Sequence, residues 1–132
     1  MEQHQKNAFA IAKWLQKQPR VQYVLYPGLE NHPGYVINKA QTTGFGGMIS
    51  FAVDNAETAR QIREGVKLIK FIESLGGTES LITYPIRQTH TDLTAEECAE
   101  KGITDCLLRF STGIEATHDL IDDLAQAFAV IE

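Results

Sequence analysis

The sequence predicts an α/β domain, an open sandwich in which helices cover one face of a small sheet. Two observations lead to this class. Stretches with helical spacing of apolar side chains alternate with short apolar strands, and 132 residues with 43% hydrophobic content suit one core. Since the chain shows no internal repeat, linker or low-complexity tract, residues 1–132 are expected to form a single domain.

The first half of the chain is expected to alternate helix and strand. Residues 8–15 carry apolar side chains at helical spacing, and this helix should end before Pro19, because a residue that precedes proline avoids the helical conformation. Asp54 followed by Glu57 predicts an N-cap with its capping-box partner. The other expected elements are a strand at 21–28, a helix at 31–40, a buried strand at 46–53 and a helix at 55–65.

The second half continues the alternation. Residues 66–74 have the apolar character of a strand, and a Thr-x-x-Glu capping box and a closing glycine predict a short helix within 94–102. A strand follows at 106–113, and Thr117 is predicted to cap a final amphipathic helix. The apolar face of this helix consists of Leu120, Leu124, Phe128 and Ile131, and its positive N-terminal end carries Asp119, Asp122 and Asp123.

The composition argues against several classes of partner. The net charge is −5 and no Lys/Arg cluster forms a stripe, so we expect no nucleic-acid binding. No apolar run approaches the roughly 18 residues of a membrane span, and the charged N-terminus is unlike a secretory signal, so we expect a cytoplasmic protein. Cys98 and Cys106 are too few for a zinc site; free thiols are expected, with a disulfide left open.

Arg109 is the first candidate for binding an anion. In the strand at 106–113, period-two alternation puts it on the face opposite Leu108 and Phe110. A buried guanidinium needs an anionic partner, and its planar fork matches a carboxylate in two-point contact. That partner is either the carboxylate of a ligand or a carboxylate of the chain such as Glu115, in a structural ion pair.

The glycine-containing loop at 74–77 is the second candidate. Its serine hydroxyl and backbone N–H groups could meet an anion, whereas the simpler interpretation is a turn that ends a strand. Metal binding is not expected, since the cluster of His90, Asp92, Glu96 and Glu97 matches no standard spacing. No Ser-His-acid arrangement is evident, and the other histidines, His4, His32 and His118, are expected at the surface.

Two longer stretches, FIESLGGTESLITYP and CLLRFSTGIEATHDLIDDLAQAF, resemble the C-terminal domain of the pyridoxal-phosphate (PLP)-dependent enzymes of Cys/Met metabolism. This family includes cystathionine γ-synthases, γ-lyases and β-lyases and the homoserine sulfhydrylases. The similarity extends back through NAFAIAKWLQKQPRVQYVLYPGLENHP and GFGGMISF and so covers essentially the whole chain. It implies a small, mainly antiparallel sheet with helices on one face, as in the C-terminal domain of fold-type I PLP enzymes.

The resemblance also implies roles for individual residues. Arg109 matches the arginine that holds the substrate α-carboxylate, and Ser74 matches a serine whose loop lies at the same carboxylate, near the cofactor-bearing lysine. Thr89 matches a threonine near that pocket. Glu73 occupies a position that faces the distal end of the substrate in γ-synthases and γ-lyases. Departures from the family pattern within residues 84–88 leave the reaction open.

The resemblance further implies that this chain is one part of a larger enzyme. In the family, PLP forms a Schiff base with a lysine in a Ser-x-Thr-Lys context within a large N-terminal domain, and none of the seven lysines here has that context. Residues 1–18 would form the helix between the two domains. The chain alone is therefore expected to be inactive, whereas the intact homo-oligomer, typically a tetramer, would act on cystathionine, acylated homoserine or cysteine.

A second hypothesis needs no cofactor. The chain would be a free-standing, non-catalytic module that binds amino-acid carboxylates through Arg109 or serves oligomerisation. A third, purely structural hypothesis has Arg109 paired internally with an acidic side chain.

Overall fold

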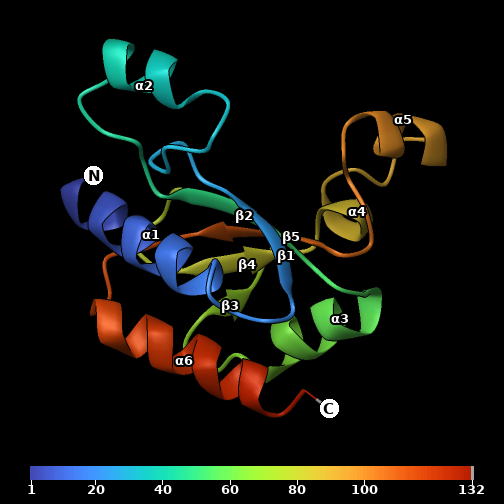
Figure 1. Ribbon diagram of the computed structural model, residues 1–132. Helices are drawn as coiled ribbons and strands as arrows, with labels where there is room; N and C mark the ends of the chain where they lie inside the picture. The colour runs from blue at the N-terminus through green and yellow to red at the C-terminus, as the bar shows by residue number, and fades with distance from the viewer. Residues whose placement is uncertain (132) are drawn as a thin grey trace.

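Five short strands form one sheet in the computed structural model, which describes residues 1–131 (Figure 1). They are β1 (Val21–Leu25), β2 (Met48–Val53), β3 (Lys70–Phe71), β4 (Leu81–Thr83) and β5 (Leu107–Ser111). Their order across the sheet is β1-β2-β5-β4-β3. Every neighbouring pair is antiparallel except β3 and β4, which run parallel. The sheet is therefore mainly antiparallel, as predicted, and β5 lies at its centre.

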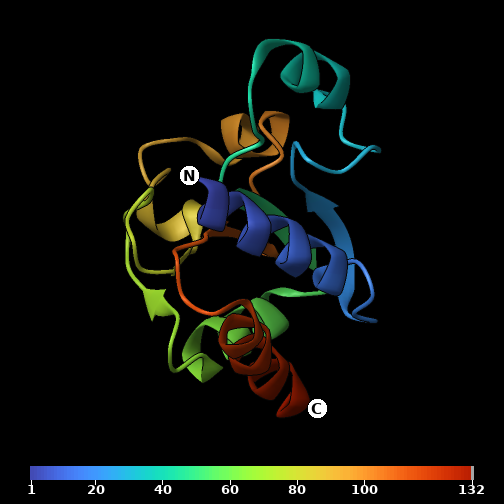
Figure 2. The same ribbon diagram turned by 90° about the vertical axis from the view of Figure 1, so that its left-hand side faces the viewer.

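Three longer helices pack on one face of this sheet. The helices are α1 (Glu2–Leu15), α2 (Tyr35–Gln41), α3 (Ala56–Gly65), α4 (Pro85–Gln88), α5 (Ala95–Glu100) and α6 (Thr117–Ala129). Both α1 and α3 contact β2, and α6 contacts both of these helices, as Figures 1 and 2 show. The short helices α2, α4 and α5 lie outside this layer, and α2 buries none of its residues. This arrangement confirms the predicted fold class.

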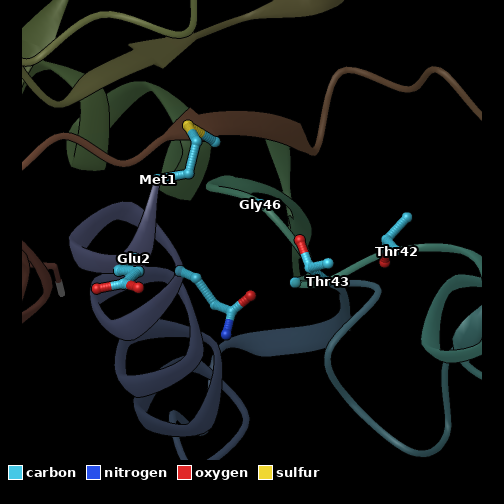
Figure 3. Close-up of a pocket in the computed structure, with 7 residues that line it drawn as sticks. Met1, Glu2, Thr42, Thr43 and Gly46 are labelled. Atoms are coloured by element: carbon cyan, nitrogen blue, oxygen red, sulfur yellow. The ribbon is translucent and has the colours of Figure 1, made fainter.

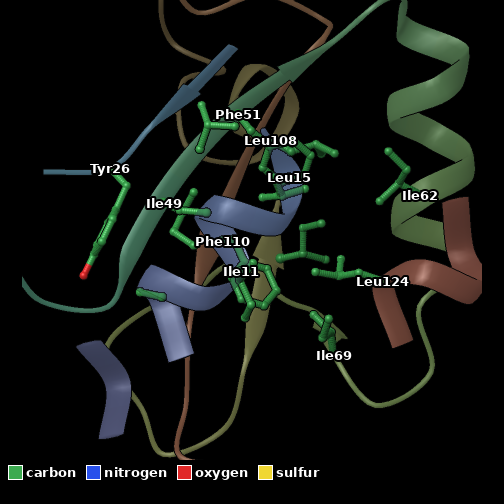
Figure 4. Packing of buried hydrophobic residues seen from close by; sticks show 14 of the residues in the cluster. Ile11, Leu15, Tyr26, Ile49, Phe51, Ile62, Ile69, Leu108, Phe110 and Leu124 are labelled. Atoms are coloured by element: carbon green, nitrogen blue, oxygen red, sulfur yellow. The ribbon is translucent and has the colours of Figure 1, made fainter. Parts of the chain in front are cut away.

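The core fills the space between the three helices and the sheet (Figure 4). Ile49 and Phe51 of β2, with Leu108 and Phe110 of β5, point into it and are almost completely buried. The helices contribute Ile11 and Leu15 from α1, Ile62 from α3 and Leu124 from α6. Full burial of each such side chain is worth about 1.5–3 kcal/mol, so the helical face of the sheet carries most of the stabilisation.

The strand predicted at 66–74 is much shorter in the structure, where only β3 pairs with a neighbour. The reason is Asp123 of α6, which is 7% exposed. Its carboxylate accepts hydrogen bonds from the backbone N–H groups of residues 67–69, at 2.8–2.9 Å. Donors that are already bound to a carboxylate cannot join a strand ladder. Asp123 therefore fixes the connection between α3 and β3.

Other local predictions were wrong in detail. Asn55, and not Asp54, caps α3, since its side chain accepts the N–H of the third residue along at 2.8 Å. Thr117 does not cap α6; its hydroxyl donates to Asn7 Oδ1 of α1 at 2.6 Å. The sequence analysis missed β4 and α4, which are only three and four residues long. The capping box of α5 and the free state of both cysteines are confirmed.

Membrane insertion by a helix finds no support in the part of the chain that the structure describes. None of the helices within residues 1–131 has both the length and the apolar character needed to cross a bilayer.

We predict that Asp123→Asn lowers the free energy of unfolding by about 2–3 kcal/mol, because the amide places donors against backbone N–H groups that a carboxylate satisfied. Urea denaturation followed by circular dichroism measures this change. Asp122→Asn is the matched control, since Asp122 is exposed on the same helix and its substitution should change stability by less than about 0.5 kcal/mol. Equal effects of the two substitutions would contradict the role of Asp123.

Candidate functional site

Arg109 lies on the face of the sheet opposite the three-helix layer. It occupies the middle of β5, and the alternation predicted from the sequence is confirmed, since its neighbours Leu108 and Phe110 point into the core. Across the two flanking strands its partners in register are Ser50 of β2 and Thr83 of β4. Directly opposed residues in antiparallel strands project from the same face, so three polar side chains form one row.

The guanidinium of Arg109 has no carboxylate partner within residues 1–131, where no acidic oxygen lies within 4 Å of it. Its Nη2 donates to Thr83 Oγ1 over a long 3.4 Å, and its Nε is buried without an acceptor. The ion pair with Glu115, considered above as the alternative, is absent. Glu115 instead accepts hydrogen bonds from the backbone N–H and the hydroxyl of Ser80, at 2.6 and 2.8 Å.

The glycine-containing loop crosses the same face of the sheet as Arg109. Thr83 Oγ1 donates to the carbonyl of Ile72 at 3.1 Å, and the N–H of Gly76 donates to Ser111 Oγ at 2.8 Å. Since Thr83 and Ser111 both project from the Arg109 face, these bonds hold residues 72–76 over it. Gly76 adopts a φ of 76°, a conformation that side-chain-bearing residues rarely take, which explains one of the two glycines.

Within this loop, Glu73 and Ser74 are exposed, and neither side chain has a hydrogen-bond partner among residues 1–131. The backbone N–H of Ser74 donates to the carbonyl of Ile72 at 3.0 Å. The structure thus brings the loop onto the Arg109 face but makes no direct bond between Ser74 and Arg109 in the described residues. Both side chains remain available to a ligand.

Thr89 lies at the C-terminal end of α4, which packs against β5. Its hydroxyl is 2.7 Å from His90 Nδ1 and 3.4 Å from the carbonyl of Pro85. No hydrogen bond joins Thr89 to Arg109 in the part of the chain that the structure describes. The nearby Tyr84 donates its hydroxyl to the carbonyl of Asp105 at 2.8 Å, and burial raises the pKa of Tyr84.

His4 was expected at the surface, but it contacts the far end of the loop. Its Nε2 lies 3.0 Å from the carbonyl oxygen of Gly77, and its Nδ1 is buried without a partner within residues 1–131. The backbone carbonyl of His4 also accepts from Thr112 Oγ1 at 3.0 Å. The first turn of α1 therefore supports the glycine loop, which sequence spacing could not reveal because 73 residues separate the two.

A buried polar network lies beneath the loop. Ser80 Oγ, which donates to Glu115, also accepts the N–H of Gly113 at 2.8 Å. The side-chain amide of Asn7 donates to the carbonyls of Gly113 and Glu115 at 3.0 and 2.8 Å. A Cβ atom at Gly113 would overlap the backbone carbonyl oxygen of Thr78. Only glycine permits this close packing, which fixes β5 and the loop relative to each other.

The hollow drawn in Figure 3 is a less suitable anion site. It has a volume of about 370 Å³ and lies between the start of α1 and the segment before β2. Its lining residues are Met1, Glu2, Gln5, Thr42, Thr43, Gly44 and Gly46. The only charged side chain among them is the acidic Glu2, which would repel a carboxylate or a phosphate.

The described residues do not form a site that fits PLP. All seven lysines are exposed. Lys6 borders a hollow of about 370 Å³ that is largely aromatic, but no arginine, serine or threonine lines it to bind a phosphate. Likewise, no group of three or more metal-ligating side chains comes together within residues 1–131.

Comparison with known proteins identifies the family of this chain. The family model described as "Cys/Met metabolism PLP-dependent enzyme" matches residues 1–129. The chain belongs to this family. The resemblance inferred from the sequence is thus confirmed, and the cofactor of the family is PLP.

Two relatives of this family illustrate its range of reactions. The cystathionine γ-lyase of Dictyostelium discoideum is 50% identical over 128 residues, which are 96% of this chain and 33% of that protein. The cystathionine γ-synthase of Haemophilus influenzae is 48% identical over 129 residues, 98% of this chain and 31% of that protein. The chain therefore spans about a third of the length of the curated relatives that it matches.

The fold is also that of a solved family member. The crystal structure of cystathionine γ-synthase from Xanthomonas oryzae pv. oryzae in complex with cystathionine matches with a TM-score of 0.91 and 43% identity. The match covers 99% of this chain and 35% of that chain.

We predict that Gly113→Ala lowers the free energy of unfolding by about 2 kcal/mol or more, because the added methyl group must displace backbone at Thr78. Gly77→Ala is the control, since a Cβ there would meet only ordinary van der Waals contact. Thermal and urea unfolding of both variants measure the difference. A Gly113→Ala variant as stable as Gly77→Ala would contradict the packing described here.

Proposed function

We propose that this chain is the C-terminal, substrate-side domain of a PLP-dependent transsulfuration enzyme and that Arg109 binds the α-carboxylate of a sulfur amino acid. The observation that carries the proposal is the uncompensated guanidinium of Arg109, which lies on the sheet face opposite the three-helix layer, beside the glycine loop. A half-buried cation without an internal counterion is costly unless a ligand supplies the negative charge. A carboxylate suits it because it accepts two parallel hydrogen bonds from the guanidinium.

The other residues of the site take supporting roles in this proposal. The hydroxyl of Ser74, exposed and unbonded within the described residues, would donate to the same carboxylate. Glu73, equally exposed, would face an amino group at the distal end of a cystathionine-type substrate. Thr89, on the α4 side of β5, would border the pocket. None of these residues is proposed to be catalytic.

The remainder of the active site belongs to the rest of the enzyme. PLP would supply the electron sink for bond cleavage at the amino-acid Cα, and a lysine outside this chain would hold it. Residues 1–18, which contain α1, would join the two domains, and the intact protein would be a cytoplasmic homo-oligomer. Cystathionine, acylated homoserine and cysteine are the proposed substrate class. Identities of 50% to a γ-lyase and 48% to a γ-synthase do not favour one reaction.

The role of Arg109 can be tested in a full-length chimera in which this chain replaces the matching third of the Dictyostelium discoideum cystathionine γ-lyase. We predict that Arg109→Ala lowers kcat/KM for L-cystathionine at least about 100-fold, since a charge-assisted carboxylate contact is lost. Arg109→Lys should recover part of this loss, because it restores the charge without the fork. Arg60→Ala, on the exposed face of α3, is the control and should match the unmodified chimera. Near-normal turnover of Arg109→Ala would refute the proposed role.

The absence of a cofactor site in this chain can be tested directly. We predict that incubation of the 132-residue chain with PLP, followed by borohydride reduction, gives only scattered, substoichiometric adducts by intact-mass spectrometry, because all seven lysines are exposed. The chimera, treated in the same way, should carry one adduct per chain. A single stoichiometric adduct on the isolated chain, at Lys6 for example, would contradict the proposed division of the site.

Calorimetric titration of the isolated chain with L-cystathionine provides the complementary measurement. Little or no heat is expected, because the chain would supply only one side of the pocket. Saturable binding that depends on Arg109 would instead favour the free-standing amino-acid-binding module.

A further inference from the structure

Thr83 links the two features that the proposed function requires. It projects from the Arg109 face of β4, lies directly opposite Arg109 in register, and is only 1% exposed. Its hydroxyl accepts a hydrogen bond from Arg109 Nη2 at 3.4 Å and donates one to the carbonyl of Ile72 at 3.1 Å. A threonine hydroxyl has one donor and two acceptor positions, so it can make both bonds at the same time.

The bond to Ile72 reaches the turn that presents Ser74. The carbonyl of Ile72 accepts the Thr83 hydroxyl and also the backbone N–H of Ser74, at 3.0 Å. Within residues 1–131, two side chains of the sheet face form hydrogen bonds with residues 72–76: Thr83, and Ser111, which accepts the N–H of Gly76. Of the two, only Thr83 also forms a hydrogen bond with the guanidinium in the described residues. Ser50, the residue opposite Arg109 on the other side, makes no hydrogen bond to it within residues 1–131.

The direction of these bonds couples the arginine to the loop. A cationic donor draws electron density from the hydroxyl oxygen, which strengthens the bond from that hydroxyl to the next acceptor. The orientation of the guanidinium and the position of the Ser74 turn then depend on the same oxygen atom. A carboxylate that binds Arg109 meets a loop whose location is already fixed, which reduces the ordering cost of binding.

We infer that Thr83 is a positioning residue that holds the guanidinium of Arg109 and the Ser74 loop in register for the substrate carboxylate. This inference rests on the proposed function of Arg109, and it assigns to Thr83 no contact with the reacting atoms. Valine has the shape of threonine without the hydroxyl, so Thr83→Val removes both hydrogen bonds while it keeps the packing volume. Thr83→Ser keeps the hydroxyl and removes only a methyl group.

Two measurements test the inference. In the full-length chimera, Thr83→Val should raise KM for L-cystathionine about tenfold and change kcat less than about threefold, because the hydroxyl serves binding geometry rather than chemistry. Thr83→Ser, which keeps the hydroxyl, should restore KM.

In the isolated 132-residue chain, Thr83→Val should speed amide hydrogen exchange at Ser74 about tenfold. Exchange in β2 of this variant should stay at the unmodified rate, and so should exchange at Ser74 of Thr83→Ser.

The outcomes separate this inference from the proposed function. If Arg109→Ala leaves turnover unchanged, the proposed function fails whatever Thr83 does. If Arg109→Ala abolishes turnover but Thr83→Val matches the unmodified protein in KM and in exchange at Ser74, only the positioning role fails. Should Thr83→Val not fold, Thr83→Ala replaces it, since it removes the same two bonds without adding apolar bulk. Failure of both variants to fold would show that Thr83 serves stability alone, and this would overturn the inference.

Discussion

The central strand of the sheet carries a positive charge that the described part of the chain does not neutralise. Arg109 stands in the central strand of the sheet, on the face opposite the helices, with one long hydrogen bond and a buried, unpartnered Nε. The hydrophobic core beneath it cannot stabilise this charge, because Leu108 and Phe110 occupy the other face. A neutral side chain at this position would be less costly for folding alone, and in the proposed function a ligand carboxylate supplies the missing negative charge.

The contrast with the acidic side chains nearby strengthens this interpretation. Glu115, four residues after the end of β5, binds Ser80, and Asp123 binds three backbone N–H groups after α3. Both carboxylates are thus consumed in holding connections to the sheet. Their hydrogen bonds fix the segments on either side of the glycine loop, while the side chains of Glu73 and Ser74 stay unbonded within the described residues. These two carboxylates therefore stabilise the fold, and neither forms an ion pair with Arg109 within residues 1–131.

The family relationship gives a physical reason for a site that is only half formed. The chain spans about a third of its curated relatives, and residues 1–131 present the unpaired guanidinium of Arg109 but no fitting place for PLP. In the proposed enzyme, the cofactor and its lysine meet this surface from the other domain. In such a division, the sheet of this domain would orient the substrate relative to the cofactor held by the other domain. Catalysis requires this precise placement of the reacting groups.

The sequence by itself determined the helical layer, most strands, the exposure pattern around Arg109 and the family, because amphipathic periods and long motifs are local properties of the chain. It did not reveal the shortening of the strand at 66–74, the position of β4 or the partners of Glu115. Only the tertiary structure decided these, since Asp123 lies more than 50 residues from the amides that it binds and a three-residue strand has no periodicity of its own. Thr83 remained unnoticed for the same reason: its importance depends on cross-strand register with Arg109, 26 residues away, which emerges only when the sheet is assembled.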